Sequence, residues 1–282
     1  MTATRSRRPD LTPTVRAALA GRFEVEREIG HGATAVVFLA RAPGGAEVAV
    51  KVLRPELMAS VAAARFLREV RLLQRLDHPG LARVTDADQA GWLLYCASEY
   101  VPGPSLRARM DEAGPLPVAE VLALAPPVLE ALGHAHQRGV VHRDVKPENV
   151  ILSPRGPVLL DFGIARAVGA AAEDEVTGAG LAVGTLDYMS PEQVRGERTP
   201  DPRTDFYALG ALLFECLTGH PPFHPATDVE LLRLQLSGTP PDLRTLRPDV
   251  PAPLAAAIAR ALAKRPEERW GSAAEFLAGL GG

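Results

Sequence analysis

Short runs of apolar residues, many of them alternating with polar ones, fill the first hundred positions and predict an antiparallel sheet. The first three predicted strands span residues 23–25, 35–39 and 47–53, and the turns between them contain glycine. A further strand is predicted at 92–98. Apolar residues at helical spacing also predict one helix, whose buried stripe contains Phe66, Val70, Leu73 and Leu76.

Beyond residue 116 the apolar spacing becomes that of helices, so the rest of the chain is predicted to be mainly helical. A helix over 118–139 is predicted to be bent or interrupted at Pro126 and Pro127, because proline lacks the N–H that a helix interior uses. The other predicted elements are a β-hairpin from 150–152 and 158–160, a buried helix at 205–217, and helices at 254–263 and 273–280.

Three segments show neither pattern. Residues 1–21 combine arginines with serines and threonines and have little apolar period before Val15, which predicts a flexible tail. The Pro-Gly pair within 99–104 predicts a linker between two lobes. The Ala- and Gly-rich segment 165–186 predicts a long surface loop, and long loops inside compact domains are often functional.

Composition places the chain among ordinary globular proteins. Of its 282 residues, 46% are hydrophobic and 23% are charged. This length suits one large domain or two lobes that share a cleft. The net charge of -3 argues against nucleic acid as the main partner. Two cysteines, Cys96 and Cys216, are too few for a disulfide framework or a zinc site.

The apolar pattern does not predict membrane insertion. No uninterrupted apolar run approaches the roughly 18 residues needed to cross a bilayer. The basic residues near the N-terminus are not followed by an apolar stretch, so they lack the pattern of a signal peptide. We therefore expect a cytoplasmic protein.

Gly30, His31 and Gly32 lie in the turn between the first two predicted strands. Two glycines allow a tight turn that brings backbone amides close to an anion such as a phosphate. Taken alone, this pattern fits an ordinary glycine hairpin equally well. It is not the dinucleotide-binding fingerprint, because a strand follows the turn where that motif requires a helix.

Lys51 lies on the third predicted strand, on the same face as Ala49, while valines at 48, 50 and 52 share the other face. We expect the valines in the core, and the small Ala49 leaves room for a flat ring with the Lys51 ammonium beyond it. Glu69, beside the apolar stripe of the predicted helix, can pair with Lys51 and fix it for phosphate binding. The alternative is a lysine on a solvent-facing strand.

The strongest pattern is the segment 142–149, His-Arg-Asp-Val-Lys-Pro-Glu-Asn, followed after the predicted hairpin by Asp161 in an Asp-Phe-Gly sequence. Asp144 can accept a proton from an attacking hydroxyl, and Lys146 can neutralise phosphate charge in the transition state. Asn149 and Asp161 carry oxygen atoms of the kind that Mg²⁺ prefers. The occurrence of both motifs, with the hairpin between them, favours a site for phosphoryl transfer over two ordinary polar turns without a chemical role.

With these motifs in this order, residues 23–280 resemble the bacterial eukaryotic-type (Hanks-type) serine/threonine protein kinases. The resemblance implies an α+β, two-lobed protein kinase fold over 22–282. The N-lobe, a small antiparallel sheet with one main helix, would occupy about 22–98. The hinge would be 99–104, and the larger, mainly helical C-lobe 105–282.

The resemblance also implies ATP as the phosphoryl donor, with Mg²⁺ or alternatively Mn²⁺. It assigns Lys51 to the phosphates, held by an ion pair with Glu69, and it makes Asp144 the catalytic base beside Lys146. Asn149 and Asp161 would hold the metal. The residues implied around the nucleotide are Gly30, His31, Gly32, Val37, Ala49, Glu99, Val101 and Ile151.

Further matches concern regulation and scaffold. Arg143 beside the base is typical of kinases whose activation loop is ordered by phosphorylation, and Thr177 is the expected acceptor. Thr185 and Lys146 fit serine/threonine substrates. The implied scaffold contacts are a buried Glu192–Arg269 ion pair, an Asp205 that holds the catalytic loop (142–149), and a hydrophobic spine of Leu73, Val84, His142 and Phe162.

The leading hypothesis is therefore a kinase that phosphorylates Ser/Thr hydroxyls of proteins and self-associates for autophosphorylation. One alternative is a pseudokinase scaffold, which predicts the loss of at least one of Lys51, Asp144, Asn149 and Asp161, and all four are present. Another is a small-molecule phosphotransferase of the aminoglycoside-kinase type. That class lacks both the lysine at the Lys146 position and the Ser-Pro-Glu segment at 190–192.

Overall fold

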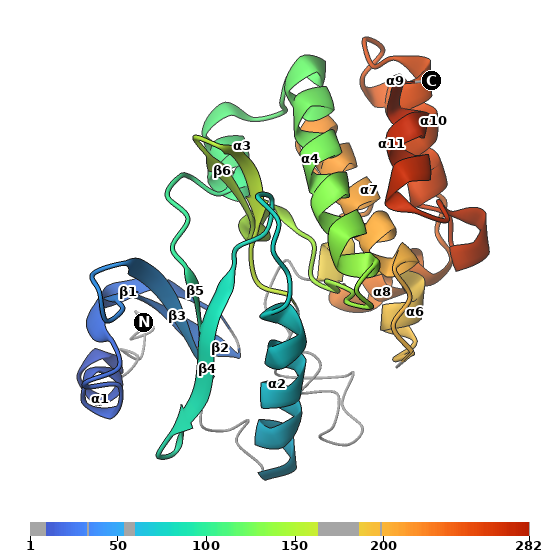
Figure 1. Cartoon of the computed structure of the whole chain (residues 1–282). Helices are drawn as coiled ribbons and strands as arrows, with labels where there is room; N and C mark the ends of the chain where they lie inside the picture. Colours follow the sequence, from blue (N-terminus) through green and yellow to red (C-terminus); the bar gives the residue numbers. More distant parts are fainter. Residues whose placement is uncertain (1–9, 33, 54–59, 163–185, 198, 282) are drawn as a thin grey trace, which may run out of the picture.

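The computed structural model describes residues 10–32, 34–53, 60–162, 186–197 and 199–281 and has a sheet lobe joined to a helical lobe (Figure 1). Its sheet lobe is a five-stranded antiparallel sheet in the order β1-β2-β3-β5-β4. The strands are β1 Glu24–His31, β2 Ala35–Arg41, β3 Glu47–Leu53, β4 Val84–Ala90 and β5 Leu93–Glu99. The predicted two-lobed α+β fold is confirmed.

Helix α1, Thr12–Ala18, shows that the prediction of a flexible tail over 1–21 is wrong for this part of the chain. Val15 and Leu19 are buried, and they pack with the three valines of β3 on one face of the sheet. The helix begins at Thr12-Pro13, where proline is well tolerated. A helix of seven residues, with Val15 and the following Leu19 as its buried positions, is too short a pattern to stand out in the sequence.

Helix α2, Ser60–Leu73, covers the opposite face of the sheet. Its buried side chains Phe66 and Val70 belong to the same apolar cluster as Leu94 and Cys96 of β5. Because successive strand residues point to opposite faces, Leu93 and Tyr95 join the cluster on the α1 side instead. The sheet is thus buried on both faces.

The linker after β5 requires glycine at one position. Gly103 has φ +139°, and a Cβ there would lie 2.4 Å from the carbonyl oxygen of Leu152. Leu152 donates its N–H to the carbonyl of Pro104 at 2.9 Å, so the linker is fastened to the hairpin of the helical lobe. That hairpin pairs β6, Val150–Ser153, with β7, Gly156–Leu159, as predicted.

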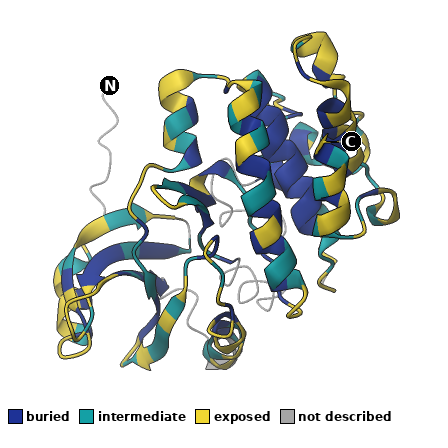
Figure 2. Ribbon diagram, turned by 45° about the horizontal axis from the view of Figure 1, so that its top comes forward, coloured by how far each residue is buried: buried dark blue, intermediate teal, exposed yellow. Residues whose placement is uncertain are grey.

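The helical lobe is built around α7, Arg203–Thr218, in which every residue from 204 to 217 is buried (Figure 2). This confirms the buried helix predicted at 205–217. The remaining helices are α3 Leu106–Ala113, α4 Val118–His136, α6 Pro191–Val194, α8 Asp228–Ser237, α9 Leu243–Leu246, α10 Ala252–Ala261 and α11 Ala273–Gly281. Short 3₁₀ turns are η2 Pro147–Asn149, η3 Leu186–Tyr188 and η4 Pro266–Glu268.

Helix α4 was predicted to be bent or interrupted at Pro126 and Pro127, and the structure shows that it is not interrupted there. Its apolar face, which includes Val121, Val128 and Leu132, packs against α7 and α11 and outweighs the backbone hydrogen bonds that the prolines remove. By length and hydropathy alone α4 could cross a bilayer. In this structure the helix contributes to the core of the lobe.

Candidate active site

Lys51 projects from β3 on the face away from α1, in register with Val37 of β2 and Cys96 of β5. Its Nζ lies 3.2 Å from Oδ2 of Asp161, which comes from the segment after β7. Burial alone would lower the pKa of Lys51, but the Asp161 carboxylate outweighs burial and raises that pKa above its ordinary value. The Asp161 carboxylate thus favours the charged form of Lys51.

The predicted ion pair between Lys51 and Glu69 is not formed in this structure. Among the ion pairs of the described residues, Lys51 pairs with Asp161 and none involves Glu69. Glu69 is half-buried on α2, a helix whose main strand neighbour is β4 rather than β3. The sequence correctly placed Lys51 on a strand and Glu69 on a helix, but it did not predict the partner of Lys51.

A buried carboxylate holds the catalytic loop by its backbone. Asp205 of α7 accepts hydrogen bonds from the amides of His142 and Arg143 at 2.8 and 2.7 Å, and His136 of α4 lies 2.7 Å from the same carboxylate. Arg143 has φ +63°, in the left-handed region that costs a residue with a Cβ about 1–3 kcal/mol. The predicted role of Asp205 is confirmed, and it explains how the strained backbone before Asp144 is maintained.

The side chains of Lys146 and Asn149 both contact the carboxylate of Asp144. Oδ2 of Asp144 lies 2.9 Å from Nζ of Lys146 and accepts a hydrogen bond from Nδ2 of Asn149 at 3.0 Å. Asn149 also donates to the backbone carbonyl of Asp144 at 2.8 Å. The side chain of Asn149 is thus held by its nitrogen.

His142 joins the catalytic loop to the Asp-Phe-Gly motif. Burial lowers the pKa of His142, so the ring is neutral and its two nitrogens have different roles. Nε2 donates to the carbonyl of Leu160 at 2.8 Å, and Nδ1 accepts from the amide of Asp144 at 3.3 Å. The ring also lies 4.6 Å from that of Phe162, and Phe162 shares an apolar cluster with Leu73 and Val84, as the predicted spine requires.

Asp161 and Asn149 are the residues that can hold a divalent cation. Asp161 has φ +47°, a strained conformation for aspartate at the start of its motif. One carboxylate and one amide oxygen, with phosphate oxygens completing the shell, suit the way Mg²⁺ is usually bound. Among the residues that the structure describes, no group of three or more His, Cys, Asp or Glu side chains could hold a metal alone.

The predicted nucleotide-binding residues lie along the same side of the sheet and hinge. Gly30 and His31 form the end of β1, so they are strand residues and not part of the predicted turn; Gly32 follows, and its amide donates to the carbonyl of Ala35 at 2.8 Å. His31 is exposed and lies 3.0 Å from Glu28. The residues predicted to surround adenine are placed as follows: Val37 on β2, Ala49 half-buried on β3, Glu99 at the end of β5, and Val101 and Ile151 in one apolar cluster.

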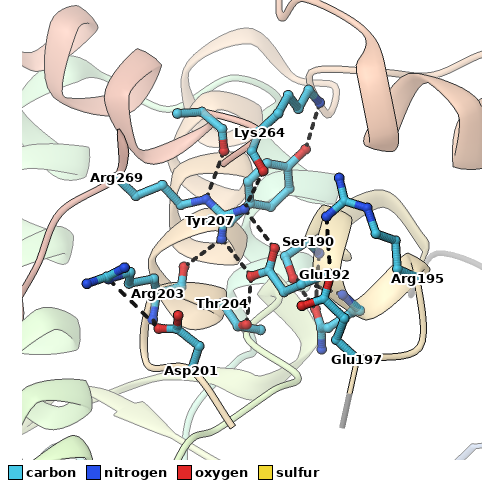
Figure 3. Close-up of polar contacts among 12 residues, drawn as sticks. Ser190, Glu192, Arg195, Glu197, Asp201, Arg203, Thr204, Tyr207, Lys264 and Arg269 are labelled. Carbon is cyan, nitrogen blue, oxygen red and sulfur yellow. Dashed lines mark hydrogen bonds and ion pairs between the residues drawn. The ribbon is translucent and has the colours of Figure 1, made fainter. Parts of the chain in front are cut away.

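The predicted Glu192–Arg269 ion pair is confirmed and is bidentate, at 2.6 and 2.8 Å (Figure 3). Burial would raise the pKa of Glu192, but the Arg269 guanidinium lowers it below the ordinary range. Thr204 donates to the same carboxylate at 2.8 Å. This pair fixes α6 against the segment that follows α10.

Two of the predicted regulatory residues, Thr177 and Thr185, lie outside the described residues, as does nearly all of the predicted loop 165–186. The third regulatory residue, Arg143, donates its backbone amide to Asp205. Its carbonyl accepts a hydrogen bond from Nε2 of Gln193 at 2.9 Å. Gln193 therefore links α6 directly to the residue before Asp144.

Arg107 of α3 is a residue that sequence reasoning missed. Its guanidinium donates to Glu148 at 3.1 Å, to Glu215 at 2.9 Å and to the Tyr188 hydroxyl at 2.7 Å. It thereby connects the catalytic loop, α7 and η3. An exposed-looking arginine on a short helix carries no signal in one sequence that separates it from a solvated residue.

Comparison with known proteins identifies the class of this chain. The protein kinase domain family matches residues 23–278, and the chain belongs to that family. It is 42% identical to the serine/threonine-protein kinase AfsK of Streptomyces coelicolor over 233 residues, which cover 80% of this chain and 29% of AfsK. It is 38% identical to the serine/threonine-protein kinase PknB of Mycobacterium leprae over 269 residues, covering 93% of this chain and 43% of PknB. The chain thus spans less than half the length of these relatives.

Proposed function

We propose that the chain is a serine/threonine protein kinase that transfers the γ-phosphoryl group of ATP to Ser/Thr hydroxyls of proteins. The observation that carries the proposal is the convergence of Lys146 and Asn149 on the Asp144 carboxylate, with Lys51 and Asp161 paired nearby. The similarity to kinases named for serine/threonine substrates supports the choice of acceptor.

The chain's own residues supply positioning and charge. Asp144 orients the acceptor hydroxyl and takes its proton, while the hydroxyl oxygen bonds to the γ-phosphorus and the bond from that phosphorus to the β–γ bridging oxygen breaks. Lys146 and Lys51 neutralise negative charge on the phosphoryl oxygens. Asn149 and Asp161 would hold a divalent metal, for which we propose Mg²⁺, and the metal would neutralise the charge on the phosphates.

We further propose that Thr177 is phosphorylated by a second copy of the chain and that this raises activity. The support is Arg143, a guanidinium placed next to the base and able to pair with a phosphate bidentately. A Thr177→Ala protein should transfer phosphate more slowly after preincubation with ATP than the wild type does. Equal rates would exclude this regulation and leave the kinase activity untouched.

The experiment that tests the proposed function offers one enzyme three kinds of acceptor. Wild-type chain and Asp161→Asn are incubated with γ-labelled ATP and a Ser/Thr peptide mixture, a Tyr peptide, or an aminoglycoside. Label on Ser/Thr peptides with the wild type alone is the expected result. Label on the aminoglycoside would support a small-molecule phosphotransferase, and ATP binding without any transfer would support the pseudokinase.

A further inference from the structure

Gln235 is a buried polar residue in the helical lobe that the catalytic residues do not explain. It lies on α8, is 1% exposed and follows Leu231 by one helical turn, in a position that would suit an apolar side chain. Its Nε2 donates to two successive backbone carbonyls of η3, those of Leu186 at 3.2 Å and Asp187 at 2.8 Å. Two carbonyls held by one amide fix the backbone of η3 in place.

The orientation of this amide is set by a chain of donors behind it. Lys264, which can only donate, lies 3.3 Å from the Tyr207 hydroxyl (Figure 3). It also donates to the carbonyls of Leu234 and Gln235 at 3.0 and 2.9 Å. The Tyr207 hydroxyl accepts from Lys264 and donates its own proton to Oε1 of Gln235. The nitrogen of the amide must therefore face η3.

Behind this chain lies the buried ion pair. The guanidinium of Arg269 lies 5.0 Å from the centre of the Tyr207 ring, on the same side of the lobe as Glu192 (Figure 3). Tyr207 itself is fully buried on α7. These contacts connect the buried part of the helical lobe to η3. Each polar group along the way has its hydrogen-bond partners, and a buried network that is fully bonded in this way restricts motion.

The segment that Gln235 holds borders the catalytic base. Two residues after η3, the serine at position 190 caps α6, and Gln193 of that helix donates to the carbonyl of Arg143, the residue before Asp144. On the other side, Arg107 binds both the Tyr188 hydroxyl of η3 and Glu148 of the catalytic loop. Through these contacts η3 is tied to the loop that carries Asp144, where the proposed function places the acceptor hydroxyl.

We propose that Gln235 is a positioning residue for the protein acceptor: by fixing the carbonyls of Leu186 and Asp187 it holds η3 as the wall against which the acceptor lies. The inference rests on the proposed kinase function and specifies part of its acceptor site. Among the described residues, the side chain of Gln235 bonds to η3 and Tyr207 and to none of the residues expected to contact ATP on β1 to β3, at the hinge or in the C-lobe, so its loss should affect the acceptor and spare the nucleotide.

The experiment compares the full-length wild type with Gln235→Met, which keeps the length of the side chain and removes both donors. Arg233→Gln is the matched control, because Arg233 lies on the exposed face of α8 and pairs only with Glu230 in this structure. Histone serves as the Ser/Thr acceptor, and the KM for histone, the KM for ATP and acceptor-free ATP hydrolysis are measured. We expect the histone KM of Gln235→Met to rise about tenfold, with the two nucleotide parameters unchanged.

A second variant keeps the test decisive if Gln235→Met does not fold. Gln235→Glu retains the acceptor for Tyr207 but can donate to η3 only when it is protonated, and burial raises the pKa of such a carboxyl. Its histone KM relative to wild type should therefore rise as the pH increases, whereas the ratio for Arg233→Gln should stay flat.

The possible results distinguish the role of Gln235 from the proposed kinase function. An unchanged histone KM in an active Gln235→Met protein, a parallel rise in the KM for ATP, or a flat pH ratio for Gln235→Glu overturns the role of Gln235 and leaves the kinase function standing. A wild type that labels no Ser/Thr acceptor overturns the proposed function, and the role of Gln235 with it.

Discussion

Asp205 shows how single residues prepare this site. Its carboxylate receives two successive backbone amides and a histidine, so replacing it would leave buried donors without an acceptor. The residue it supports most directly is Arg143, whose positive φ would otherwise relax. Asp144, the proposed base, is thus positioned through the backbone that Asp205 holds.

Asp187 provides a prediction about pH. Burial and the nearby Glu215 raise its pKa to about 6, from 3.8 in an unfolded chain. Between these values the folded protein keeps a proton that the unfolded chain has lost, so the free energy of unfolding falls as the pH rises through this window. Asp187→Asn removes the cost and should be more stable than wild type above pH 6 by about 1 kcal/mol, a value discounted for solvent screening at this half-buried position.

The measurement is urea denaturation of both proteins at pH 7.5 and pH 4. The advantage of Asp187→Asn should shrink to a small fraction at pH 4, where the carboxyl is protonated in the folded protein and close to half protonated in the unfolded chain. Asp249→Asn is the control of opposite sign, because a hydrogen bond from Arg247 lowers the pKa of Asp249. An equal gain at both pH values would show that the charge of Asp187 is not the cause.

At the scale of elements, α1 has a defined structural task. Leu19 is fully buried against the face of β3 opposite to Lys51. Leu19→Ala should lower the free energy of unfolding by about 2–5 kcal/mol and raise the KM for ATP, because the strand that carries Lys51 loses its support. Thr14→Ala, on the exposed side of the same helix, should change neither quantity in denaturation and kinetic assays. If both variants behave alike, α1 does not support the sheet.

The hinge offers a second test at this scale. In Gly103→Ala the new Cβ meets the carbonyl oxygen of Leu152, and the residue must also keep a positive φ. Gly114→Ala separates the two effects, since Gly114 has φ +70° with no atom near the added Cβ. We expect Gly114→Ala to cost about 1–2 kcal/mol and Gly103→Ala clearly more, with a raised KM for ATP in Gly103→Ala alone. Similar melting temperatures and similar KM values would contradict a constrained hinge.

The elements that the sequence predicted well are those with a strong apolar pattern. The valines of β3 and the apolar stretch of α7 lie in the core, as their periods required. Strand β4 was missed because Val84–Ala90 is mostly polar: it pairs with β5, and its apolar residues Val84 and Ala87 are only partly buried against the core. The short helices α3 and α8 were missed for a similar reason, since each buries only two of its residues.

The candidate site divides in the same way. Lys51, Asp144, Asn149 and Asp161 could be predicted because their chemistry depends on residue type and local spacing. The partner of Lys51 could not, because the choice between Glu69 and Asp161 depends on how α2 lies relative to β3. Arg107 and Gln235 act through contacts between residues 41 to 108 positions apart, which one sequence does not reveal.

At the scale of the whole molecule, one apolar cluster connects the two lobes. It contains Phe66 and Val70 of α2, Phe162 of the Asp-Phe-Gly motif and the buried faces of α4 and α7. The linker on the other side is fastened by Gly103 and Leu152. The distance between Lys51 and the catalytic loop is therefore set by packing as well as by the hinge, and phosphoryl transfer is expected only from the folded pair of lobes.

The most direct test of that function compares the full wild-type chain with Asp144→Asn for two properties, phosphate transfer from MgATP to a Ser/Thr protein and equilibrium binding of ATP. Asp144 interacts with Lys146 and Asn149 in the C-lobe, away from the predicted adenine contacts at the hinge, so ATP affinity should be preserved. Transfer should fall by about 10²- to 10⁴-fold, the usual contribution of a general base. Transfer by Asp144→Asn at the wild-type rate, or no transfer by a wild type that binds ATP, would contradict the assignment of this site as a kinase active site.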